Sequence, residues 1–226
     1  MRAYVALVWA VARKDLLVEF RTHERLTAMA AFTVLIGVLF NFSIDTAVVR
    51  PQDIAAALIW MTIIFGGMLG MGRTFRLEEQ DGALTGILQS PIPLNALYLG
   101  KVLANFVLMS VMVVLVFVVF VAFFRLRFSG NPVTLVGVMA CGVLGFVALT
   151  TLFSAMATRS SMGESLLPVL VFPLLVPVIR FGTTATDRLF AGRPVAEVSG
   201  DLRMLAAFAI IFTVTCAWFF RFVIEE

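Results

Sequence analysis

Charged side chains are scarce in this chain. Asp, Glu, Lys and Arg make up 14% of its 226 residues, whereas hydrophobic residues make up 61%, and the mean hydropathy is +1.03. A water-soluble domain with so few charges could not cover its surface with polar groups. The sequence therefore predicts a polytopic membrane protein. Its net charge of +3 bears on orientation in the membrane and gives no sign of nucleic-acid binding.

The residues of catalytic and metal sites are scarce too. Cys141 and Cys216 lie in separate apolar runs, without the spacing of a disulfide framework or a haem-attachment site. The single histidine, His23, is more typical of a surface residue than of a ligand. The chain lacks the H-E-x-x-H, G-x-S-x-G and G-x-x-x-x-G-K-[ST] motifs of metalloproteases, hydrolases and nucleotide-binding proteins. We therefore expect no catalysis and no metal or cofactor bound by this chain, so any nucleotide-driven work must be powered by another subunit.

The apolar residues form six runs that are long enough to cross a bilayer as helices. We therefore predict an all-α membrane protein with a single transmembrane domain, residues 1–226. The expected spans are residues 26–44, 54–71, 99–124, 132–157, 165–180 and 204–224. The charged residues cluster at the ends of these spans, and a polar stretch from Gly182 to Arg203 is long enough for short interfacial helices.

The N-terminal residues 1–25 mix apolar and charged side chains. This mixture is typical of an amphipathic helix in the membrane interface, with its charges in water and its apolar side among the headgroups. Six spans place both termini on one side of the membrane. Lys and Arg are more numerous on that side, so we expect both termini in the cytoplasm.

Glycine and proline suggest how the spans pack. Glycines spaced by four or eight residues allow neighbouring helices to approach closely, and they lie in the second and fourth runs. These residues are Gly66, Gly70, Gly137 and Gly145. Pro168, Pro173 and Pro177 lie in the fifth run, so its helix must kink or break. That run is either a flexible element of a transport path or an irregular packed helix.

The segment between the second and third runs, residues 73–93, carries an unusual pattern. Asp81 can cap a short helix that Pro91 and Pro93 end, and its apolar residues fall on one face. Those residues are Leu84, Ile87 and Leu88. Gly82 weakens the helix in isolation, which favours docking on a partner. The alternative is a solvated loop whose leucines rest on the membrane surface.

In combination these features resemble the CcmB family. The resemblance covers nearly the whole chain, from the opening ARKDLLVEFRTHE to the late proline run. It rests on an F-x-x-E/D-x-x-D-G-x-L segment ending in S-P-x-P, on a following G-K pair, and on three spaced prolines. The matching residues are Phe75, Glu78, Asp81, Gly82, Leu84, Ser90, Pro91, Pro93, Gly100, Lys101, Pro168, Pro173 and Pro177.

The resemblance implies the membrane permease subunit of an ABC transporter of cytochrome c maturation, in the bacterial inner membrane. Two copies of such a subunit pair with two copies of a separate ATPase, which binds ATP. The segment between spans two and three is then the cytoplasmic coupling helix that docks on the ATPase, through Phe75, Glu78, Asp81, Gly82, Leu84, Ile87 and Leu88. Further partners are a haem-handling membrane protein and a periplasmic haem chaperone, with haem as a possible substrate.

The chain itself offers few haem ligands. The tryptophans Trp9, Trp60 and Trp218 are scattered and form no tryptophan-rich motif, and the methionines are dispersed. Whether haem crosses this subunit or the complex only releases a loaded chaperone therefore stays open. Two alternatives stay open as well: an ABC permease for another substrate, and a non-transporting membrane scaffold for assembly factors.

Overall fold

The computed structural model describes residues 2–45, 48–75, 92–158 and 163–225, and these ranges contain helices and no strand. The helices are α1 (Arg2–Thr22), α2 (Glu24–Ser43), α3 (Pro51–Met71), α6 (Leu94–Phe124), α7 (Pro132–Thr158), α8 (Gly163–Phe190) and α9 (Val195–Glu225). All except α1 are long and apolar enough to cross a membrane. The prediction of an all-α membrane protein with six spanning helices is confirmed.

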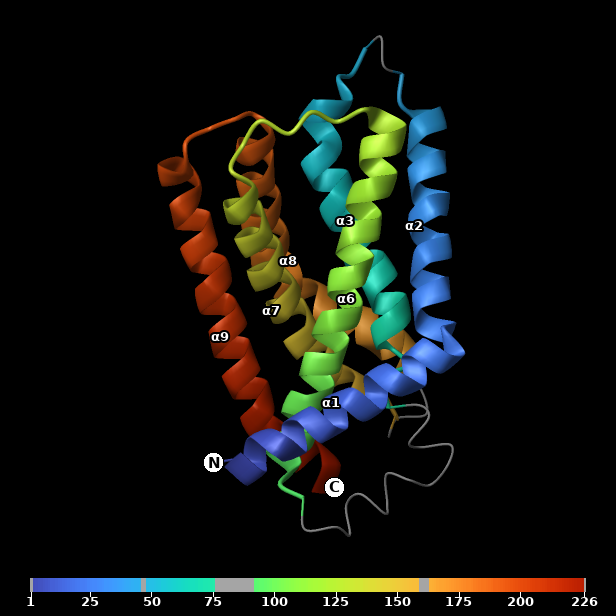
Figure 1. The fold of residues 1–226 in the computed structure, drawn as a ribbon, viewed down its shortest axis with the longest axis vertical. Coiled ribbons are helices and arrows are strands. Elements are labelled where there is room, and N and C mark those ends of the chain that lie inside the picture. Colours follow the sequence, from blue (N-terminus) through green and yellow to red (C-terminus); the bar gives the residue numbers. More distant parts are fainter. Residues whose placement is uncertain (1, 46–47, 76–91, 159–162, 226) are drawn as a thin grey trace.

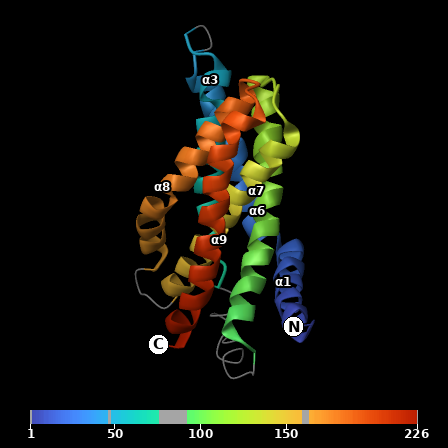
Figure 2. The ribbon, with the colours of Figure 1, turned by 90° about the vertical axis from the view of Figure 1, so that its left-hand side faces the viewer.

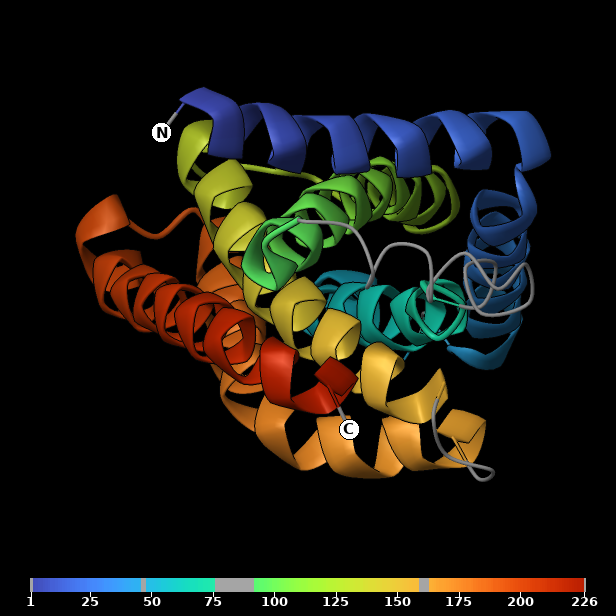
Figure 3. The same cartoon turned by 90° about the horizontal axis from the view of Figure 1, so that it is seen from below.

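The six long helices form a bundle, and α1 lies across one end of it (Figures 1 and 3). We call this the α1 end and the opposite one the far end. Both termini lie at the α1 end (Figure 1). Helix α6 packs against α1, α2, α3 and α7, while α7, α8 and α9 pack on one another. Helix α6 therefore connects the N-terminal part of the bundle with the C-terminal part.

The fifth and sixth spans differ from the sequence prediction. Helix α8 continues to Phe190 and α9 begins at Val195, so the polar stretch forms the ends of two long helices and not separate interfacial helices. A short turn joins them, and its Gly192 has a φ of 70°, which glycine adopts without strain. Arg188 stabilises the turn, because its Nη1 donates to the carbonyl oxygen of Glu197 at 2.7 Å and pairs with Asp201 at 2.8 Å. At the far end, polar residues of α8 and α9 thus pair with each other.

The three prolines of the fifth span lie inside α8, which stays one continuous α-helix. A proline inside a helix removes a backbone donor and its ring clashes with the preceding turn. Figure 2 shows the result, because α8 bows and its N-terminal half leans away from α9. The structure therefore has a bent helix where the sequence allowed either a kink or a break.

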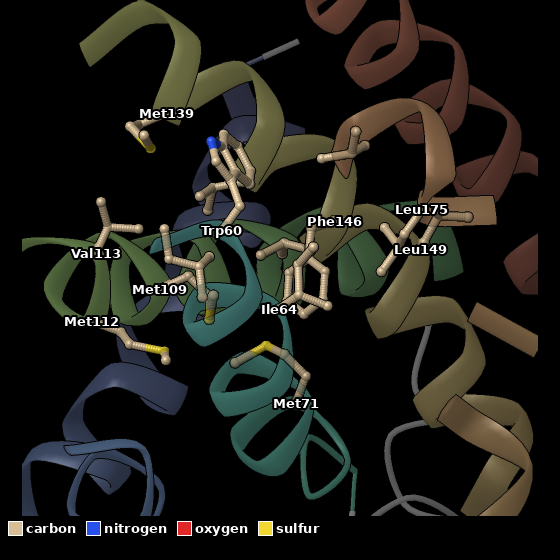
Figure 4. Packing of buried hydrophobic residues seen from close by; sticks show 14 of the residues in the cluster. Trp60, Ile64, Met71, Met109, Met112, Val113, Met139, Phe146, Leu149 and Leu175 are labelled. Carbon is tan, nitrogen blue, oxygen red and sulfur yellow. The ribbon is translucent and has the colours of Figure 1, made fainter. Parts of the chain in front are cut away.

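The largest buried side chain is Trp60 of α3, which is fully enclosed. Its indole Nε1 donates to Thr186 Oγ1 of α8 at 3.0 Å. A Cβ added at Gly142 of α7 would lie 2.3 Å from the indole, and one added at Gly182 of α8 would lie 2.6 Å from it. Figure 4 shows the indole among the neighbouring core residues. These glycines make room for the ring, so Trp60 joins three helices.

The glycines singled out in the sequence also lie between helices. A Cβ at Gly66 would come within 2.3 Å of Met112 Cε, and one at Gly70 within 2.5 Å of Met29 Sδ. At Gly145 the neighbour is the ring of Phe208 at 2.7 Å, whereas at Gly137 the nearest atom, on Leu202, lies at an ordinary 3.7 Å. Flexible methionine side chains therefore fill the space beside α3.

Trp60→Ala should destabilise the bundle by about 3–5 kcal/mol, because it leaves a cavity between three helices and removes the hydrogen bond that the indole donates to Thr186. Trp218→Ala is the matched control, since the Trp218 side chain is 56% exposed on α9. Thermal unfolding of the two purified variants in detergent measures the difference. If the two variants lowered the unfolding temperature equally, Trp60 would contribute no more to stability than the exposed Trp218.

Candidate functional site

Helix α1 approaches α6 most closely at Gly100. A Cβ at this position would lie 2.6 Å from Val11 Cβ and 2.9 Å from the backbone oxygen of Val8. Because one of these atoms belongs to a helix backbone, a larger residue would force the two helices apart. Gly100 thus allows α1 to bring Asp15 and Glu19 against the bundle, where Glu19 is buried and Asp15 nearly so.

Lys101, the residue after Gly100, is buried with only 1% of its side chain exposed. Its Nζ donates to Asp15 Oδ2 at 3.1 Å and to the backbone oxygen of Thr74 at 3.1 Å. The ammonium also lies 4.5 Å from the centroid of the Phe75 ring, a favourable cation–π distance. A buried charge is tolerated only when it is paired and hydrogen-bonded. Lys101 therefore holds α1, α6 and the chain after α3 together.

A second set of contacts begins at Glu19. Its carboxylate accepts from Arg25 Nε at 2.8 Å and from the backbone N–H groups of Arg25 and Leu26 at 2.9 and 3.0 Å. These N–H groups belong to the first turn of α2, where intrahelical partners are missing. His23, which precedes that turn with a φ of 53°, makes no side-chain cap. Glu19 thus caps α2 from the preceding helix and fixes the bend between α1 and α2.

The contacts that begin at Glu19 lead to Thr74, which Lys101 also contacts. Arg25 Nη1 donates to Asn105 Oδ1 at 3.1 Å. Asn105 Nδ2 then donates to Thr74 Oγ1 at 3.2 Å and to Thr151 Oγ1 of α7 at 3.0 Å. We call Asp15, Glu19, Arg25, Thr74, Lys101 and Asn105 the Thr74 clamp. The clamp fixes both the backbone and the side chain of Thr74.

The Thr74 clamp lies directly before the predicted docking segment. Phe75, which the sequence assigned to that segment, is buried in the bundle, with its ring centroid 5.9 Å from that of Phe220 on α9. Ser154 Oγ of α7 donates to the Gly72 backbone oxygen at 3.4 Å. The other predicted docking residues, Glu78, Asp81, Gly82, Leu84, Ile87 and Leu88, lie outside the described residues. Phe75 is thus an internal anchor at the entrance to the segment.

The clamp was not predicted from the sequence. The charges of the N-terminal helix were expected in water and the other charges at the ends of spans, whereas Glu19 and Lys101 are buried between helices. Apolar side chains of α1 are exposed instead, namely Val5, Trp9, Leu17 and Phe20. One signal was present: Asp15 and Glu19 are four residues apart, as are Lys101 and Asn105, so each pair shares one face of its helix. Two polar faces with matching spacing indicate that the helices meet there.

The clamp residues pair with one another and with backbone groups. In the described ranges, no three His, Cys, Asp or Glu side chains gather as they would around a metal ion. The carboxylates of the clamp are occupied by Lys101 and Arg25. Such a network can transmit a displacement, because moving Thr74 would strain two hydrogen bonds to α6, whose donors Lys101 and Asn105 in turn contact α1, α2 and α7.

Comparisons with known proteins agree with the resemblance found in the sequence. The CcmB protein family matches residues 6–222 of the chain. Heme exporter protein B of Escherichia coli K12 is 28% identical over 202 residues, which cover 89% of this chain and 90% of that protein. The protein of the same name from Pseudomonas aeruginosa PAO1 is 28% identical over 206 residues, covering 91% and 90%. The one from Rhodobacter capsulatus is 27% identical over 201 residues, covering 87% and 88%.

Lys101→Met should destabilise the chain by about 3–5 kcal/mol, because it leaves the Thr74 carbonyl without its donor from α6 and, among the described residues, leaves Asp15 paired only with the exposed Lys14. Adding Asp15→Asn should recover part of this loss, with a coupling energy of about 0.5–3 kcal/mol. A double-mutant cycle by thermal unfolding in detergent measures the coupling. Arg13→Met, at an exposed position of α1, is the control and should leave the unfolding temperature unchanged. Additive effects of the two clamp substitutions would rule out the pair as a structural link.

Proposed function

The chain belongs to the CcmB protein family, and on this premise we propose that it is the membrane permease subunit of an ABC transporter serving haem export in c-type cytochrome biogenesis. The observation that carries the proposal is the family match, which extends from α1 to α9. The relatives named heme exporter protein B align over about nine-tenths of their length, so the likeness includes the whole bundle.

ATP is hydrolysed in this proposal by a separate ATPase, because the chain has no nucleotide-binding loop of its own. Two copies of the chain pair with two copies of the ATPase, and residues 73–93 contain the coupling helix that docks on it. The Thr74 clamp supports this assignment. A segment that is displaced by a partner can move the spanning helices only if it is firmly connected to them. Thr74, at the start of this segment, is hydrogen-bonded to α6, and the same network includes residues of α1, α2 and α7.

We place the α1 end in the cytoplasm of a bacterial cell, with the spans in the inner membrane. Basic residues of α1 and the first turn of α2 support this orientation, since Lys and Arg are enriched on the cytoplasmic side. They are Arg2, Arg13, Lys14, Arg21 and Arg25. The far end then faces the periplasm, where a haem-handling membrane protein and a haem chaperone are the proposed partners.

The proposed mechanism begins with movement of the ATPase. Docked on the coupling helix, the ATPase shifts the chain at Thr74 when its nucleotide sites close. The shift reaches α6 through Lys101 and Asn105, and α1 through Asp15. It also reaches α9, since Phe75 packs on Phe220 and Phe220 packs on Tyr98 at 5.2 Å. Movement of these helices against one another would open a path or release a loaded chaperone at the far end.

Leu84→Ala and Leu88→Ala should each weaken ATPase docking by more than about 1 kcal/mol, because a few buried side chains carry most of the energy of an interface. Asp81→Lys should have a larger effect, since it removes the helix cap and places a cation at the positive end of the helix dipole. The measurements are ATPase co-purified per membrane subunit and c-type cytochrome assembled in cells.

Leu35→Ala is the matched control, because Leu35 is exposed in the middle of the spanning helix α2. The control should retain both association and assembly. If all three docking variants also retain them, the segment is not the coupling helix. If no ATPase co-purifies with the unaltered chain, the transporter assignment itself fails.

A further inference from the structure

The exposed side of α1 carries large apolar side chains, although α1 is not one of the six spanning helices. Its other side packs on α6, and Ala12 and Glu19 are buried there. The exposed apolar residues are spaced by three, four and eight positions, so they share one side of the helix. They are Val5, Trp9, Leu17 and Phe20, each between 49% and 62% exposed. Because α1 lies across one end of the bundle (Figure 3), this apolar side faces away from it.

The charges of α1 are divided between its two sides. Both carboxylates point into the bundle, where the side chains of Glu19 and Asp15 are 4% and 10% exposed. The exposed charged residues of α1 are all cations, namely Arg2, Arg13, Lys14 and Arg21. Lys14 pairs with Asp15, whereas Arg13 and Arg21 form no ion pair with another described residue. The exposed side of α1 thus attracts anions without a carboxylate of its own to repel them.

The connection to α2 places α1 at a membrane surface. Only His23 separates the end of α1 at Thr22 from the start of α2 at Glu24. Helix α2 has 20 residues, which is about 30 Å of helix and matches the thickness of a bilayer core. The start of α2 therefore lies near the headgroups, and so does α1.

A bilayer surface suits both features of the exposed side of α1. Tryptophan and other apolar side chains insert at the boundary between headgroups and acyl chains, while Lys and Arg attract anionic headgroups. An acidic soluble protein would complement the cations alone, because its charged surface would leave the apolar side chains in contact with water. Lipid is therefore the partner that this surface fits.

We infer that the exposed side of α1 binds anionic phospholipid headgroups, and that this binding holds α1 in the position that the Thr74 clamp requires. A guanidinium binds a phosphate through two parallel hydrogen bonds, which Arg13 and Arg21 can donate. Asp15 and Glu19 lie on the same helix, so lipid that holds α1 also keeps these carboxylates within reach of their partners in the clamp. The binding of lipid does not depend on the proposed function.

Hydrogen exchange of the purified chain in lipid nanodiscs tests the binding. Adding phosphatidylglycerol to phosphatidylcholine discs should slow amide exchange in Arg2–Thr22 on the order of tenfold, since each Lys or Arg near an anionic surface strengthens binding about fivefold. High salt should diminish this protection, because it screens the charges. If phosphatidylglycerol leaves exchange in α1 unchanged, this side of α1 does not recognise anionic lipid and the inference fails.

Paired substitutions test the residues. Arg13→Gln with Arg21→Gln should remove most of the protection by phosphatidylglycerol. Arg125→Gln with Arg127→Gln is the matched control, since these two exposed arginines follow α6 at the far end, and it should retain the protection. Both double variants should exchange like the unaltered chain in detergent without phospholipid, because neither alters a residue of the clamp. Equal loss of protection in the two double variants would show a general charge effect and would overturn the inference.

The consequence for transport rests on the proposed function. In cells, Arg13→Gln with Arg21→Gln should co-purify as much ATPase as the unaltered chain but assemble less c-type cytochrome, because α1 is then held less firmly against the clamp. Full assembly would contradict the role of lipid in holding the clamp. If the unaltered chain binds no ATPase, the proposed function fails, whereas the protection by lipid in the purified chain still supports the inference.

Discussion

The buried ammonium of Lys101 is the constraint on which the α1 end of this protein depends. A charge in an apolar bundle is stable only if other groups solvate it, and here the solvating groups come from different parts of the chain. Asp15 is supplied by α1 and the backbone oxygen of Thr74 by the turn after α3. Gly100 must be small so that α1 can reach the site. One charge therefore fixes the positions of three segments that the sequence separates widely.

The two ends of the bundle contribute differently to the proposed transport. At the α1 end, the Thr74 clamp makes the entrance to the docking segment part of the spanning helices. At the far half, the bent α8 packs on α3, α7 and α9. Helix α9 connects the two regions, because it contacts Phe75 through Phe220 and packs along α8. A displacement at Thr74 can thus reach α8 through α9.

The sequence was sufficient for the fold class and for the six helices that can span a membrane, because long apolar runs have few stable alternatives in a bilayer. It was insufficient wherever polar side chains pair between helices. Arg188 and Asp201 look like residues of a solvated loop, yet their ion pair lets α8 and α9 continue as helices. Asp15 and Lys101 look like interfacial charges until α1 docks on Gly100. Such pairings depend on three-dimensional contacts that local composition does not encode, so the clamp could not be predicted from the sequence.

The Asp15→Asn, Lys101→Met double variant tests the central claim most directly, because it removes both buried charges, and among the described residues the only other ion pair it affects is that of Asp15 with the solvent-exposed Lys14. The measurement is ATP hydrolysed by the purified complex compared with c-type cytochrome assembled in the same cells. If the clamp transmits the work of the ATPase, the variant should bind the ATPase and hydrolyse ATP but assemble little cytochrome. Assembly at the level of the unaltered chain would show that the work does not pass through Lys101.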